Sequence, residues 1–167
     1  RPKSATFRTC DIAGVDVCVK VAQNLYDAVP GDPERAIFKV PAFMTAMVER
    51  KWLGEKTGIG FYKKEGKEIL ALDWKALAHH PRQKPKFPSV EAAQNNPDVA
   101  ARLQQLMAGK DKAAQFLWRS LSSTCLYAAS LVPEISDDIV SIDRALEWGY
   151  GWGMGPFKIL DALGVAA

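Results

Sequence analysis

The feature that most constrains the fold is a short motif that occurs twice, 150 positions apart. The motif reads F-x-x-x-D-x-x-G-V, and its fixed positions are Phe7, Asp11, Gly14 and Val15 in one copy and Phe157, Asp161, Gly164 and Val165 in the other. Each copy predicts a short helix whose aspartate holds backbone groups or a neighbouring helix, and which a left-handed glycine ends. The chain is therefore predicted to contain the end of one structural repeat and the beginning of the next.

Hydrophobic periodicity predicts helices over most of the chain. The first predicted helix covers residues 6–13 and is ended by Gly14, and the second is capped by Asp16 and has Val17, Val21, Leu25 and Ala28 on one face. A third begins at Pro41, and short helices are predicted in "SVEAAQ" and "PDVAARLQQLM". The longest covers Asp111–Val132, and the "DDIV" helix follows it. Between them, "GFYKK" and "EILAL" flank Glu65 and Gly66 and predict a small β-hairpin.

The stretch "WGYGWGMGPF" resembles a phosphate-binding loop in its glycine content. Such a loop follows a strand, whereas the residues before this one have helical spacing, with Ser136 or Asp137 as the N-cap. The spacing G-x-G-x-G-x-G also differs from the dinucleotide fingerprint G-x-G-x-x-G. We therefore predict a structural turn in which Gly149 ends one helix and Pro156 begins the next. A backbone surface for a ligand carried by another domain is the alternative.

Composition excludes several classes of protein. The 167 residues are 48% hydrophobic and 25% charged, which is ordinary for a globular chain. The net charge of +3 is spread along the sequence without a dense basic block, so no nucleic-acid partner is expected. Cys10, Cys18 and Cys125 lack metal-site spacing and are predicted to be reduced thiols of a cytoplasmic protein without a metal site. No apolar run reaches membrane-spanning length. The start "RPKSATF", without Met, is expected of a piece of a longer protein.

Three motifs resemble, in order, the helical C-terminal domain of 3-hydroxyacyl-CoA dehydrogenases. "LGEKTGIGFYKK" is similar to the K-T-G-x-G-F-Y segment that ends that domain, "VPEISDDIVSIDRALEWGYGWGMGPF" to its glutamate-containing helix, aspartate pair and glycine turn, and "GMGPFKILDALGV" to its G-P-M-G-P-F-x-L-x-D-x-x-G-L pattern. The start "RPKSATFRT" resembles the long bacterial enzymes that carry two tandem copies. The resemblance implies a mainly α fold, a helical bundle of the 6-phosphogluconate dehydrogenase C-terminal type with a small β-hairpin.

The resemblance, together with the proline-rich basic stretch "HHPRQKPKFP", divides the chain. Residues 1–72 are expected to be the second half of the first helical repeat, residues 73–98 a linker, and residues 99–167 the first half of the second repeat. Each half has an apolar helix face that it cannot bury alone. We therefore expect the halves to pack together within one chain or between the two chains of a homodimer.

The family resembled oxidises 3-hydroxyacyl-CoA to 3-oxoacyl-CoA with NAD in fatty-acid β-oxidation. Its catalytic His–Glu pair lies in an N-terminal Rossmann domain, which the resemblance implies as a partner, with acyl-CoA as the substrate. This sequence has no Rossmann fingerprint, and His79 and His80 lie in the expected linker, where a solvated turn is favoured over catalysis. No catalytic residue and no bound cofactor are therefore expected in this chain by itself, and binding of CoA by the chain alone is the least favoured interpretation.

Four basic residues are candidate ligand contacts. Lys56 of "KTGIGFY" matches a lysine that reaches bound NAD in the family, and a solvent-facing lysine is the equally weighted alternative. Lys3 and Arg8, together with Arg1, are candidates for the phosphates of CoA, although exposed charges that only add solubility are favoured.

Arg119 of "FLWRS" stands where the family motif F-I-x-N-R has its catalytic Asn. A guanidinium group cannot both donate and accept hydrogen bonds as an amide does, so the second copy is predicted to be non-catalytic. The second functional hypothesis is therefore a non-catalytic assembly or dimerisation module within the same enzyme.

Overall fold

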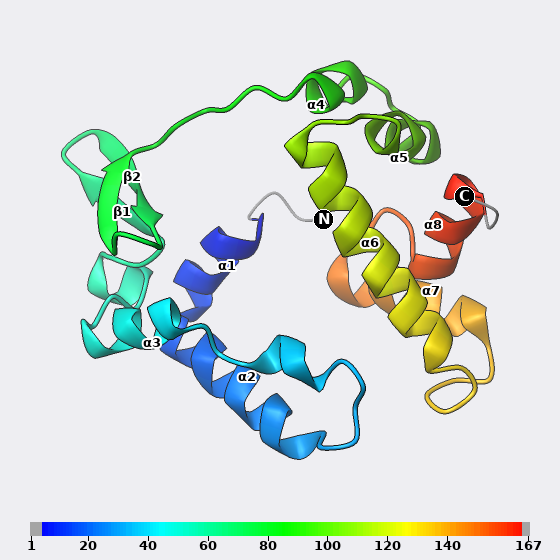
Figure 1. Ribbon diagram of the computed structural model, residues 1–167, viewed down its shortest axis with the longest axis horizontal. Helices are drawn as coiled ribbons and strands as arrows, with labels where there is room; N and C mark the ends of the chain where they lie inside the picture. Colours follow the sequence, from blue (N-terminus) through cyan, green and yellow to red (C-terminus); the bar gives the residue numbers. More distant parts are fainter. Residues whose placement is uncertain (1–4, 165–167) are drawn as a thin grey trace. The chain divides into compact units, whose positions relative to one another are not determined.

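The computed structural model describes residues 5–164. It divides the chain into two compact units, and the boundary between them in the sequence lies between Lys84 and Pro85. The first unit contains α1 (Ala5–Ala13), α2 (Val15–Ala28), η1 (Arg35–Phe38), α3 (Ala42–Glu49), η2 (Glu55–Thr57), β1 (Tyr62–Glu65), β2 (Glu68–Asp73) and β3 (Ala78–Pro81). The second contains α4 (Pro88–Ala93), α5 (Val99–Met107), α6 (Lys112–Ser130), α7 (Ile139–Tyr150) and α8 (Pro156–Leu163) (Figure 1). The mainly α fold is confirmed.

The first unit is built around the junction of α1 and α2. Gly14 ends α1 with φ 103°, a conformation that glycine adopts without steric cost, and α2 begins at the next residue. Val15 and Met47 are fully buried there, and Phe61 is 7% exposed. The backbone N–H of Val15 donates to the Leu53 carbonyl oxygen at 3.1 Å, which ties α2 to the segment after α3.

The predicted hairpin is present but forms part of a three-stranded antiparallel sheet in the order β1-β2-β3. Tyr62 pairs with Ala71 in the first ladder and Leu72 with His79 in the second. The third strand comes from residues that were expected to be an extended linker. It pairs with the edge of β2, Ala78 and His79 are half-buried, and Pro81 stands at the strand end, where a missing N–H costs little.

The segment 73–98 is therefore structured over much of its length. Strand β3 belongs to the first unit, and α4 begins with Pro88, with Ser89 and Ala93 buried. The carboxylate of Asp111 accepts hydrogen bonds from the backbone N–H and the hydroxyl of Ser89, at 2.9 and 2.8 Å, and so joins α4 to the start of α6. The assignment of the two units to halves of neighbouring repeats stays a prediction.

In the second unit, α8 packs against α5, α6 and α7. Three of its helices have aspartate N-caps, at Asp98, Asp111 and Asp138, each accepting from backbone N–H groups of the first turn. The predicted caps Ser136 and Asp137 are wrong by one or two positions, because Asp138 is the residue whose oxygens reach the N–H groups of Val140 and Ser141.

Three further expectations are corrected by the structure. Asp16 lies in the first turn of α2 and Gly14 is the N-cap, because Asp16 is bound to a lysine instead. Gly149 lies inside α7, and Gly151, with φ 63°, ends that helix. Asp161 is exposed, whereas Asp11 at the matching position of the repeat is 2% exposed.

Candidate functional site

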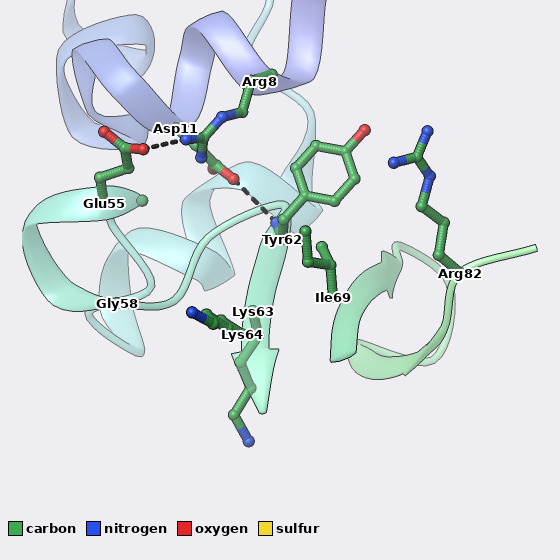
Figure 2. A pocket seen from close by; sticks show the side chains of 10 residues that line it. Arg8, Asp11, Glu55, Gly58, Tyr62, Lys63, Lys64, Ile69 and Arg82 are labelled. Atoms are coloured by element: carbon green, nitrogen blue, oxygen red, sulfur yellow. Dashed lines mark hydrogen bonds and ion pairs between the residues drawn. The ribbon is translucent and has the colours of Figure 1, made fainter. Parts of the chain in front are cut away.

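The candidate site of the first unit centres on Asp11, a buried carboxylate on α1. Its Oδ1 accepts a hydrogen bond from the backbone N–H of Phe61 at 2.8 Å. Its Oδ2 accepts from the backbone N–H of Tyr62 at 2.9 Å, the bond drawn in Figure 2. A Cβ placed on Gly60 would lie 2.6 Å from the Gly54 Cα and closer still to the Asp11 carboxylate. The two glycines therefore allow the "TGIGFY" segment to approach the helix closely. This confirms that the motif aspartate holds backbone groups.

Two consecutive residues of η2 hold the same loop to the two helices. The Glu55 carboxylate is paired with the Arg8 guanidinium of α1. The Lys56 ammonium donates to Oδ1 of Asp16 on α2 at 2.5 Å. Glu55 and Lys56 therefore face different helices and mark two separate sides of the loop.

The Lys56–Asp16 pair has a clear electrostatic effect on the aspartate. The hydrogen bond from Lys56 is the main cause that lowers the pKa of Asp16 below its ordinary value of 3.8, and the charge of Lys56 adds to it. The two side chains are 45% and 25% exposed, so the pair is open to a ligand from solvent. At neutral pH the site offers one cationic donor and one anionic acceptor next to each other.

The structure brings Arg8 and Lys56, two of the four predicted ligand contacts, to the same η2 segment, where Arg8 pairs with Glu55 and Lys56 with Asp16. The other two, Lys3 and Arg1, lie outside the described residues. Arg119 is exposed on α6.

The two histidines differ from the solvated turn that was expected. His79 lies in β3, where its Nε2 donates to the Gly60 carbonyl oxygen at 2.9 Å and its ring packs edge-on against Trp52, with 5.0 Å between ring centroids. His80, the next residue, is exposed. His79 thus binds the same glycine loop that Asp11 holds.

The glycine-rich stretch of the second unit forms a structural turn, as predicted. The carboxylate of Asp143, 4% exposed, accepts from the backbone N–H groups of Phe157 and Lys158 at 2.8 and 3.1 Å. Glu147 accepts from the N–H of Gly155 at 3.0 Å. The N–H groups at the start of α8 are therefore occupied by carboxylates of α7.

Asp143 is the site residue that sequence reasoning missed. It stands four positions after Ile139, on the same helix face as an apolar residue, and an acidic residue on an apolar face is a signal for a buried partner. The partners are the N–H groups of Phe157 and Lys158, which follow Gly155 and Pro156, much as the N–H groups bound by Asp11 follow Gly60. A Cβ on Gly155 would lie 2.5 Å from the Asp143 Cγ.

The described residues provide few other groups for chemistry. Within residues 5–164, no three His, Cys, Asp or Glu side chains are placed to hold a metal ion. Burial and the neighbouring Cys18 raise the pKa of the Cys10 thiol to about 12, which disfavours the nucleophilic thiolate. None of the helices in this part of the chain combines the length and hydropathy of a membrane span.

Comparison with known proteins identifies relatives over the whole chain. A "Probable 3-hydroxyacyl-CoA dehydrogenase" of Bacillus subtilis is 48% identical over 165 residues, which are 99% of this chain and 21% of that protein. A Rickettsia felis protein named as a fatty acid oxidation complex trifunctional enzyme is 29% identical over 95% of this chain and 21% of its own length. A "Probable 3-hydroxyacyl-CoA dehydrogenase" of Deinococcus radiodurans is 41% identical over 64 residues, 38% of this chain and 18% of that protein. No solved structure matches at a significant level.

The chain spans about a fifth of the length of these curated relatives. Residues 2–64 match the family model of the 3-hydroxyacyl-CoA dehydrogenase C-terminal domain. That match ends in β1 and therefore contains Asp11, Lys56 and the glycine loop between them. The resemblance carried by the sequence motifs is confirmed, and the chain belongs to the 3-hydroxyacyl-CoA dehydrogenase family.

Proposed function

We propose that this chain is part of a cytoplasmic, NAD-dependent dehydrogenase that oxidises 3-hydroxyacyl-CoA to 3-oxoacyl-CoA in fatty-acid β-oxidation. The observation that carries the proposal is the 48% identity, over 165 residues, to a relative named as a 3-hydroxyacyl-CoA dehydrogenase. The reaction needs a general base and a nucleotide-binding domain. We assign both to a Rossmann domain elsewhere in a longer polypeptide, and the chain by itself is expected to be inactive.

We assign Lys56 to the cofactor. The Lys56–Asp16 pair presents a donor and an acceptor side by side, and a ribose diol uses both, since each hydroxyl donates and accepts. A phosphate group would gain from Lys56 but would be repelled by Asp16. The donor set therefore fits a ribose of NAD better than its diphosphate. NAD, when bound, supplies the hydride acceptor, and the role of Lys56 is to orient the ribose.

We also infer that the two units are halves of tandem repeats. The supporting observation is the difference between the two motif aspartates. Asp11 is buried beneath the Gly60-Phe61-Tyr62 loop, whereas Asp161 on α8 is exposed. An exposed Asp161 is expected if the glycine loop that would bind it belongs to a later part of the second repeat.

A second candidate function is assembly, as a dimerisation module of the same enzyme. The observation that favours it is the apolar stripe of α2, where Val17, Val21 and Leu25 are 43%, 51% and 40% exposed. On α6, Phe116 and Leu126 are 70% and 66% exposed. Apolar faces of this kind mark surfaces that another helix covers.

The experiment that tests the proposed function is an assay of the full-length parent protein. NADH formation is followed with a 3-hydroxyacyl-CoA substrate and, as a control, with the corresponding free 3-hydroxy acid. We expect NADH with the thioester only. A parent protein that forms no NADH from any 3-hydroxyacyl-CoA would overturn the proposal.

A further inference from the structure

The first unit contains a pocket of about 670 Å³ between α1, the η2 loop and the sheet. Its lining includes Arg8 of α1, Tyr62 and Lys64 of β1, Ile69 of β2 and Arg82, which follows β3. In Figure 2 the Tyr62 ring is seen between the guanidinium groups of Arg8 and Arg82, with Ile69 next to it. Every lining residue precedes Pro85, so the pocket is complete within this unit.

The charges around this pocket leave a surplus of cations. Both oxygens of Asp11 accept backbone N–H groups, and Glu55 is already paired with Arg8. Within residues 5–164, Lys64 and Arg82 form no ion pair, and both are exposed. Two unpaired cations at one pocket favour an anionic ligand, and the planar Arg82 guanidinium can bind two phosphate oxygens at once.

The other residues that line the pocket indicate a ligand with an apolar or aromatic part in addition to its anionic group. Tyr62 is half-buried and presents a ring face, and Ile69, 52% exposed, adds apolar surface. A volume of about 670 Å³ lies in the range of small-molecule and cofactor sites. An aromatic ring beside cationic groups is suited to stacking a base while the cations hold phosphates. We infer that this pocket binds the phosphorylated adenosine portion of a nucleotide ligand.

The inference rests on the proposed function only for the source of that ligand. Both CoA and NAD contain phosphorylated adenosine. The Lys56 side chain does not line the pocket, because Lys56 reaches α2 while Glu55 faces α1. The pocket is therefore a site separate from the Lys56–Asp16 pair, and it lets the chain bind a nucleotide without a Rossmann domain. The sequence favours no cofactor bound to the isolated chain, so the titration below decides between that expectation and this inference.

Calorimetric titration of the 167-residue chain tests the inference, with CoA, 3′-dephospho-CoA, NAD and inorganic phosphate as ligands. The variants are Lys64→Glu and Arg82→Glu, with Lys67→Glu in the β1–β2 turn, outside the pocket, as a control of equal charge change. We expect both pocket variants to weaken binding of CoA or NAD about tenfold or more, and the control to leave it unchanged. If 3′-dephospho-CoA binds the unmodified chain more weakly than CoA does, the pocket is assigned to CoA. If NAD binds and both pocket variants weaken its binding to the same extent, the pocket is assigned to NAD.

The outcomes that overturn the inference differ from those that overturn the proposed function. No binding of CoA or NAD by the chain, binding of inorganic phosphate as tight as that of the nucleotides, or binding that Arg82→Glu leaves unchanged would each refute the pocket. Circular dichroism melts identical to the unmodified chain establish that the variants fold. A parent protein without dehydrogenase activity, whose chain still loses nucleotide binding in Arg82→Glu, would refute the proposed function and leave the pocket standing.

Discussion

Gly60 and Asp11 lie so close together that a methyl group on the glycine would overlap the carboxylate. Because the neighbouring backbone of Gly54 leaves no room for the loop to shift, we expect Gly60→Ala to lower the free energy of unfolding by about 2 kcal/mol or more. Urea titration measures this. Gly31→Ala is the matched control, since a Cβ there meets nothing within 4 Å, and its effect should stay within about 0.5 kcal/mol.

The same substitution is expected to change the free energy of unfolding by different amounts at the two motif aspartates. Asp11→Asn places an NH₂ group against one of the two backbone N–H donors and should lower the free energy of unfolding by about 2 kcal/mol. Asp161→Asn changes an exposed side chain and should be close to neutral. Equal losses in the two variants would contradict the assignment of Asp11 as the residue that holds the loop.

The glycine-rich turn allows the same comparison in the second unit. A Cβ on Gly155 would lie against Asp143, so Gly155→Ala should destabilise by about 2 kcal/mol. Gly149 lies inside α7 with nothing within 4 Å of an added Cβ, so Gly149→Ala should stabilise by about 0.5–1 kcal/mol through helix propensity. Thermal melts of both variants, compared with the unmodified chain, measure these two changes in stability. A stabilising Gly155→Ala would show that the turn does not need a glycine there.

The Lys56–Asp16 pair predicts how stability depends on acid. Since the pKa of Asp16 is lowered in the folded chain, its contribution to stability is present above the ordinary value of 3.8 and is lost as the pH falls through the lower folded value. In Lys56→Met, the carboxyl group should titrate closer to 3.8. An NMR titration of the Asp16 carboxyl carbon measures the shift, and an unchanged curve in the variant would rule out Lys56 as its cause.

The exposed stripe of α2 predicts self-association of the isolated chain. If a second copy covers this stripe, Val21→Lys should convert a dimer to a monomer in sedimentation velocity experiments. Gln23→Lys, also exposed on α2, adds the same charge away from Val21 and should leave the dimer intact. A monomeric unmodified chain that binds the dye ANS strongly would contradict the assembly hypothesis.

Sequence reasoning predicted the helical class and the loop–helix contact because both depend on local patterns. The spacing of apolar residues located α1, α3, α5 and α6, and the repeated motif identified Asp11 as a residue that holds backbone. Strand β3 escaped prediction because "AHHP" has neither β-branched residues nor alternation, and it pairs only because β2 offers a free edge. Its position depends on tertiary contacts of His79 with Gly60 and Trp52, which no local pattern contains.

The site was predictable only in part for a similar reason. Lys56 was found through the family motif and Arg8 through its charge, but their partners Asp16 and Glu55 lie 40 and 47 positions away, respectively. The basic pocket joins residues from α1, β1, β2 and the end of β3, so its cations gather only when the sheet forms.

The most direct test of the account is the Michaelis constant of the full-length enzyme for NAD in Lys56→Ala. We predict an increase of about tenfold, with little change in kcat, because Lys56 orients the cofactor and takes no part in hydride transfer. Lys20→Ala, an exposed lysine on α2, is the control and should match the unmodified enzyme. A Michaelis constant for NAD that is the same in Lys56→Ala and the unmodified enzyme would contradict the assignment of this loop to the cofactor.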